Sequence, residues 1–132
     1  MKYEIHQIKL TEAETDRINN GESFPKWTAY QKATICTHRN IDEAREQTNK
    51  SLENNFYTHV ANITANSLDH VFEISNLQQE EDKVERLQPM RSVSVGDLIT
   101  DENGVSSIVL GWGFINLKQE EEEKTPIINP VF

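Results

Sequence analysis

Apolar and polar residues alternate at the start of the chain, with one irregularity near Gln7 and Ile8. The apolar positions are Tyr3, Ile5, Ile8 and Leu10. A period of two is typical of a strand with one buried face, so we predict a strand over residues 3–10. Residues 56–64 combine apolar and β-branched side chains and predict a second strand.

Helical signals follow the first strand. Thr11 and Glu14 match the capping box, in which each side chain satisfies a backbone N–H of the other residue, so we predict a short helix to about Asn19. Gly21 is suited to the left-handed conformation that ends helices. After Pro25, the spacing of the apolar residues favours a helical turn or two, although residues 35–37 also have β-favouring types and remain an alternative strand.

Two further helices are predicted in the middle of the chain. Asn40 is a good N-cap for a helix that ends near residues 54–55, and Asn66 or Ser67 for another. The predicted buried stripe of the second helix is Leu68, Val71, Phe72 and Ser75. Residues 76–88 have little to bury, and we interpret them as a solvated connection.

The segment 90–117 has the signals of consecutive strands. Gly96-Asp97 indicates a turn, and the Asn103-Gly104 pair predicts a hairpin because it accepts the positive φ angles of tight turns. Strands are then expected on either side of the hairpin and at residues 111–117. Beyond them, residues 118–132 contain the acidic run 120–123 and two prolines, and predict a flexible, disordered tail.

These elements predict an α+β fold, with a mostly antiparallel sheet and about three helices. A chain of 132 residues fits one domain, which we place at residues 1–117, followed by the acidic tail 118–132. No apolar run reaches the roughly 20 residues that cross a bilayer, and the single cysteine, Cys36, fits a reducing compartment. We therefore expect a cytoplasmic protein with no membrane partner.

The formal net charge of −9 argues against direct binding of nucleic acid, because such surfaces concentrate Lys and Arg. Much of this charge lies in two segments. The acidic residues there are Glu80, Glu81, Asp82, Glu85 and Glu120 to Glu123. The rest of the chain is only modestly acidic.

No pattern of residues predicts a catalytic or metal site. Cys36 with His38, His59 or His70 has the types of a thiolate and its base, but a lone cysteine is more often a small buried hydrophobe. The four histidines have no metal-ligand spacing, and the Gly111–Phe114 segment lacks the continuation of a phosphate loop. We therefore predict no catalytic residues, no metal and no cofactor.

Two aromatic residues in the last predicted strand are alternatives for core or interface. Trp112 and Phe114 share one face of a strand because successive side chains alternate. Core packing is favoured about two to one over an exposed interface, because large apolar side chains are more often buried.

Residues 90–99, which read Met-Arg-Ser-Val-Ser-Val-Gly-Asp-Leu-Ile, together with the Gly-Trp-Gly-Phe segment 111–114, resemble the C-terminal signature of the YodL-like domain family. The whole chain also resembles short uncharacterised proteins of cyanobacterial phages. Arg91 stands where the family often has histidine, and Trp112 where it often has a small or polar residue. The resemblance implies an accessory role and no particular reaction.

Three functions are therefore weighed. The first is a phage-type accessory protein that binds a host or phage protein, with Arg91, Asp97, Trp112 and Phe114 as interaction candidates. The second is an acidic DNA mimic of the anti-restriction or anti-defence kind, and the third is a small enzyme that uses Asp97, Arg91 or a histidine. Assembly into a homo-oligomer is left open.

Overall fold

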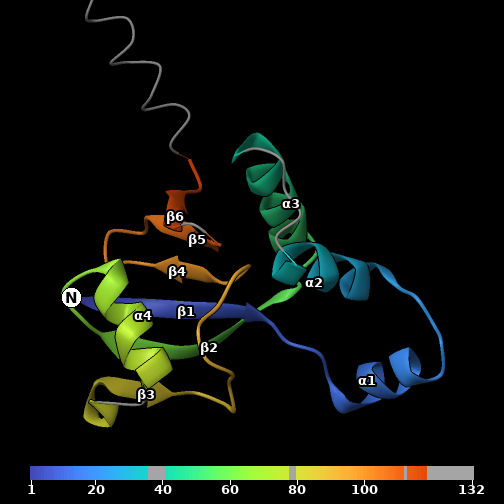
Figure 1. Ribbon diagram of the computed structural model, residues 1–132, viewed down its shortest axis with the longest axis horizontal. Helices are drawn as coiled ribbons and strands as arrows, with labels where there is room; N and C mark the ends of the chain where they lie inside the picture. The colour runs from blue at the N-terminus through green and yellow to red at the C-terminus, as the bar shows by residue number, and fades with distance from the viewer. Residues whose placement is uncertain (36–40, 78–79, 112, 119–132) are drawn as a thin grey trace, which may run out of the picture.

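The computed structural model describes residues 1–35, 41–77, 80–111 and 113–118, which form an α+β fold (Figure 1). Its six strands have the order β3-β2-β1-β4-β5-β6, and every neighbouring pair is antiparallel. The strands are β1 (Lys2–Ile8), β2 (Tyr57–Thr64), β3 (Val84–Arg86), β4 (Leu98–Thr100), β5 (Ser106–Leu110) and β6 (Gly113–Asn116). The predicted fold class is confirmed.

Four α-helices lie within the described residues, where about three were predicted. They are α1 (Glu12–Asn19), α2 (Pro25–Ile35), α3 (Ile41–Glu53) and α4 (Leu68–Leu77). The capping box of Thr11 and Glu14 is formed as expected, and the segment after Pro25 is helical over three turns. Residues 36–40, which include Cys36, His38 and the predicted N-cap Asn40, lie outside the described residues.

Helix α4 covers one face of the sheet (Figure 1). Its side chains Val71 and Ile74 are buried against a core built from several strands and from the segment before β4. The buried strand and loop residues in this core are Tyr3, Ile5, Val60, Ala61, Ile63, Ala65, Val93, Ile99 and Val109. The predicted stripe was wrong about Phe72, which is 37% exposed, because the buried face of the helix passes through Ile74 instead.

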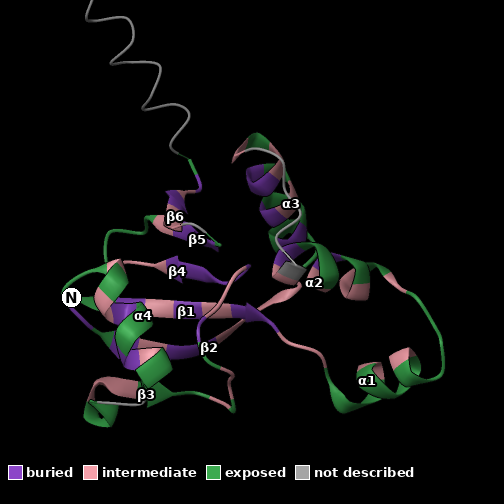
Figure 2. Ribbon diagram, viewed as in Figure 1, coloured by how far each residue is buried: buried purple, intermediate pink, exposed green. Residues whose placement is uncertain are grey.

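Helices α2 and α3 cover only part of the opposite face. Ala44 of α3 packs with strand residues of β4 to β6, and Ala29 and Ala33 of α2 pack on Ile8 at the end of β1. The strand residues under α3 are Leu98, Ile108, Leu110 and Ile115, and Leu117 follows β6. The remaining part of this face, around the middle of β1 and β2, carries side chains that are intermediate or exposed rather than buried (Figure 2).

A β-bulge interrupts the pairing of β1 with β2. Ile5 pairs with Ala61, but the next residue, His6, pairs with His59, so Val60 is an additional residue in β2. Val60 and Ala61 are both buried in the core beneath α4. The extra residue lets His59 lie beside His6 on the opposite face, and a bulge commonly re-aims side chains in this way.

The predicted solvated connection at residues 76–88 was wrong in part. It contains the end of α4, a 3₁₀ turn (Glu81–Lys83) and the edge strand β3. Strand β3 pairs with residues 61–63 of β2 through its backbone, while its side chains Glu85 and Arg86 stay exposed. Sequence periodicity cannot detect so short an edge strand, because only Val84 packs against the core.

The hairpin predicted at Asn103-Gly104 is present between β4 and β5. Gly104 has φ of +82°, and the Asp101 carboxylate accepts hydrogen bonds from the backbone N–H groups of Asn103 and Val105. Of the predicted tail, only Lys118 is among the described residues. Within the described part of the chain, no helix has the length and apolar character needed to cross a bilayer.

Candidate functional site

Two of the predicted interaction residues, Arg91 and Asp97, form an ion pair. The Arg91 Nη1 lies 2.8 Å from Asp97 Oδ1 and 2.9 Å from Oδ2. Asp97 Oδ2 also accepts hydrogen bonds of 2.9 Å from Gln7 Nε2 and from the Ser94 backbone N–H. The carboxylate is fully buried, whereas the Arg91 side chain is 34% exposed.

A tight turn places Asp97 in this position. The Asp97 N–H donates to the Ser94 carbonyl across Val95 and Gly96, and Gly96 has φ of +93°. A Cβ at Gly96 would lie 2.8 Å from the Ala33 Cβ, so glycine is required both by the turn and by the close approach of α2. The Gly96-Asp97 turn predicted from the sequence is thus present, and β4 begins directly after it.

Burial raises the pKa of the Asp97 carboxyl, while Arg91, the Ser94 N–H and Gln7 all act to lower it. Burial, and then the nearby charge of Asp97, also raises the pKa of the Tyr57 hydroxyl well above its ordinary value. That hydroxyl donates a 2.7 Å hydrogen bond to the Gly96 carbonyl. Asp97 is therefore the anchor of a buried network, and Arg91 is the member of that network that reaches the surface.

A groove of about 390 Å³ lies beside Arg91. Its lining combines Arg91 with the end of β1, the residues that follow it, α2 and the 89–90 segment. The apolar members of the lining are Ile8, Leu10, Tyr30, Pro89 and Met90. Lys9 also lines the groove, and its Nζ donates to the Gln88 side-chain oxygen at 2.8 Å and to the Pro89 carbonyl at 2.7 Å.

Phe114, the third predicted residue, is half-buried in the edge strand β6. It packs against the core under α4 and contacts Phe72 edge to face, with ring centroids 6.4 Å apart. A second hollow, of about 480 Å³, lies between α4 and the β5–β6 hairpin and is lined by both rings. Trp112, the fourth candidate, lies outside the described residues, and its role stays a prediction.

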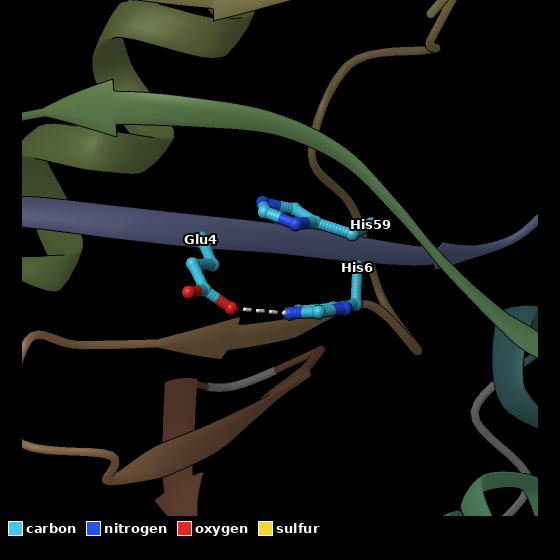
Figure 3. Close-up of side chains that lie close together, drawn as sticks. All are labelled: Glu4, His6 and His59. Atoms are coloured by element: carbon cyan, nitrogen blue, oxygen red, sulfur yellow. Dashed lines mark hydrogen bonds and ion pairs between the residues drawn. The ribbon is translucent and has the colours of Figure 1, made fainter. Parts of the chain in front are cut away.

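The structure also gathers a cluster that the sequence did not predict. Glu4, His6 and His59 lie together on the uncovered face of the sheet (Figure 3), with one ligand-type atom from each within 4.8 Å of the others. His6 Nε2 lies 3.1 Å from Glu4 Oε1, and the two imidazoles stack with centroids 4.8 Å apart. Burial lowers the pKa of His6, against the effect of its hydrogen bond to Glu4.

No sequence motif could have revealed this cluster. Helices α1, α2 and α3 lie between His6 and His59 in the sequence. The two histidines are neighbours only because the Val60 bulge fixes the register of β1 and β2. The one signal available beforehand was the broken alternation of the first strand, which indicates irregular pairing without naming the partner residue.

Of the described residues proposed for an enzyme, only Arg91 lines the groove beside it. Asp97 is buried behind Arg91 and is not among the residues that line the groove, and no histidine of the described chain lines it either. A catalytic acid or base has to reach its substrate within hydrogen-bond distance. The pairing therefore fits a role in which Asp97 holds the Arg91 guanidinium in place better than a role in which Asp97 transfers a proton.

Two of the four acidic residues in the segment 80–85 form ion pairs with local cations. Glu80 contacts Lys83 at 2.9 Å and His70 at 3.1 Å, and Glu81 contacts Arg86 at 2.7 Å. Mimicry of DNA needs a row of unneutralised charges at phosphate-like spacing. This segment does not supply such a row, and the second acidic run, at 120–123, lies outside the described residues.

Comparison of the chain with protein-family models, with curated proteins and with solved structures found no match.

Proposed function

We propose that this protein is a non-catalytic accessory module of phage type, which holds a segment of a host or phage protein in the groove beside Arg91. The observation that carries the proposal is the fixed cation at an open apolar groove. Concave apolar sites with a few placed polar groups are the usual places where proteins bind ligands.

The arrangement of Arg91 supports this role. Its Nη1 is tied to a fully buried carboxylate, and its guanidinium lies 5.9 Å from the centre of the Tyr30 ring, so the side chain is already ordered. An ordered arginine loses little conformational entropy on binding and favours planar carboxylate partners. Pre-organisation of this kind increases affinity without new contacts.

The lining of the groove indicates the chemistry of the partner segment. Leu10, Tyr30 and Met90 offer apolar contact, and Arg91 and Lys9 supply positive charge on a chain whose formal net charge is −9. A peptide segment with an apolar side chain next to a carboxylate fits this combination. The site is thus locally complementary to acidic segments, although the chain as a whole repels them.

Affinity capture tests the proposal directly. The full chain, tagged and incubated with host-cell lysate, is expected to retain a partner that the Leu10→Glu variant does not retain. Leu10 lines the groove, is only half-buried and lies beyond the end of β1, so a charge there blocks the groove without entering the core. Retained proteins are identified by mass spectrometry and their affinities are measured with purified components.

Val105→Glu is the matched control, because Val105 is 41% exposed in the β4–β5 hairpin loop and does not line the groove. A partner retained by the wild type and the control but not by Leu10→Glu supports the proposal. A partner that binds Leu10→Glu with unchanged affinity overturns it. Retention of nothing by the wild type also counts against it.

A further inference from the structure

The uncovered face of β1 and β2 presents two imidazoles and a carboxylate at one point. Glu4 and His6 are two residues apart on β1 and therefore share a face, and the Val60 bulge brings His59 beside them from β2. The side chain of Glu4 is 47% exposed and that of His6 21%, so a solute can reach the cluster. Strands of a paired sheet hold such groups more rigidly than loops do.

Hydrogen bonds behind the cluster fix the ring of His59. The Asn62 Nδ2 donates to Glu85 Oε1 at 2.9 Å, which turns the Asn62 Oδ1 toward His59. That oxygen lies 2.8 Å from His59 Nε2, so this ring nitrogen carries the proton and Nδ1 keeps the lone pair. Metal-binding histidines are commonly oriented by a chain of this kind.

We propose that Glu4, His6 and His59 form a binding site for one divalent transition-metal ion of the zinc type, with Asn62 and Glu85 orienting His59 from behind. Two imidazoles and one carboxylate suit zinc, whereas Mg²⁺ and Ca²⁺ select oxygen ligands. Three protein ligands leave further positions for water or for a group of a partner molecule.

The distances require a modest closure of the cluster. Zinc bonds of about 2.0–2.2 Å place the ligand atoms of a tetrahedral site roughly 3.4 Å apart. The ligand atoms lie within 4.8 Å of one another, and Glu4 Oε1 and His6 Nε2 are already 3.1 Å apart, so the closure of about 1 Å falls on the distances to His59. A zinc ion between Glu4 Oε1 and His6 Nε2 displaces the proton of the hydrogen bond between these two atoms. His6 then binds the ion as a neutral imidazole that carries its proton on Nδ1.

Calorimetric titration of the full chain with ZnCl₂ at neutral pH tests the site. One ion is expected to bind per chain, with no comparable binding of MgCl₂. Loss of a residue that hydrogen-bonds a metal ligand typically costs about 10–100-fold in metal affinity. Loss of a ligand itself should cost at least as much, so Glu4→Gln, His6→Gln and His59→Gln are each expected to weaken zinc binding by more than about tenfold. Asn62→Ala should weaken it by about tenfold.

His70→Gln is the matched control, because His70 also forms a 3.1 Å contact with a glutamate, Glu80, but belongs to no three-ligand group within the described part of the chain. Cys36→Ser controls for binding by the thiol. Both variants are expected to bind zinc as the wild type does. Wild-type affinity in His59→Gln, or loss of binding in Cys36→Ser, overturns the proposal.

A measurement on the unaltered chain guards against variants that fold poorly. Zinc is expected to shift the ring ¹⁵N resonances of His6 and His59 in NMR spectra and to leave those of His70 in place. Ring shifts confined to His70, or to the remaining histidine His38, contradict the site even if zinc binds to the protein.

Discussion

The side-chain amide of Gln7, near the end of β1, donates a 2.9 Å hydrogen bond to the carboxylate of Asp97, which immediately precedes β4. The same nitrogen donates to the Arg91 carbonyl at 3.0 Å, and both Gln7 and Asp97 are buried. Gln7 is thus the polar residue in an otherwise apolar face of β1, and it links this strand to the segment 91–97, which is distant in the sequence.

The Gln7→Leu substitution is expected to lower the free energy of unfolding by about 1–3 kcal/mol, because it removes a donor from a buried carboxylate and from a partly buried carbonyl. Urea denaturation measures the loss. Gln88→Leu is the control, since the Gln88 side chain accepts from Lys9 near the surface and its replacement should cost roughly 0.5 kcal/mol. Equal losses in the two variants would show that the buried network does not contribute as described.

Replacing Arg91 with methionine is expected to cost about 2–4 kcal/mol, somewhat less than for a fully buried pair because Arg91 is 34% exposed. It also removes the group that most lowers the pKa of Asp97, so that burial raises this pKa further. A carboxyl whose pKa is higher in the folded state binds more protons there than in the unfolded chain. Its contribution to stability is therefore complete at low pH and is lost as the pH rises through the folded pKa.

The difference in unfolding free energy between wild type and Arg91→Met should consequently grow as the pH is raised from about 4 toward 8. Urea denaturation across this range provides the measurement, and the comparison cancels most groups that titrate equally in both proteins. A difference that stays constant with pH would mean that the variant loses packing rather than the charge partner of Asp97.

The Gly96→Ala substitution should destabilise the fold for two separable reasons. Its φ of +93° costs an alanine about 1–2 kcal/mol, and contact with the Ala33 Cβ at 2.8 Å adds about 1–3 kcal/mol of overpacking. Gly21→Ala isolates the first effect, because Gly21 has φ of +84° and nothing within 4 Å of the added Cβ. Thermal or urea unfolding of the two variants should differ by the packing cost; similar losses would exclude a tight contact with α2.

The aromatic pair Phe72 and Phe114 is expected to be coupled energetically. Edge-to-face rings contribute about 0.5–1.5 kcal/mol beyond the area they bury. A double-mutant cycle of Phe72→Ala and Phe114→Ala, followed by urea denaturation, should therefore give a coupling energy of this size. Additive effects would show that the two rings do not stabilise each other and would leave Phe114 free for a role in binding.

Most of the fold was predictable because its elements have local signals. The alternation in β1, the capping box at Thr11 and the Asn103-Gly104 hairpin each depend on residues close in the sequence. Strand β3 was missed because its single packed residue, Val84, gives no periodicity, and the buried stripe of α4 was misplaced because Phe72 and Ile74 are equally apolar.

The site was predictable only in its residue types. Arg91 and Asp97 were selected as separate interaction candidates, whereas the structure pairs them and buries Asp97 completely. The partners that bury it, Gln7 and the turn at Gly96, come from different elements. Such contacts depend on tertiary packing, and the pairing of His6 with His59 depends in addition on strand register, which the sequence leaves open.

The additional residue at Val60 puts the two halves of β2 out of phase. His59 and Asn62 are three positions apart, an odd interval that a regular strand would assign to opposite sides, and yet they touch. Removing Val60 would therefore leave a regular ladder, because Ala61 and His59 already pair with the consecutive residues Ile5 and His6. Closing the bulge with Val60 retained would instead slip one half of β2 by one position against β1, turning polar groups inward and apolar ones to water.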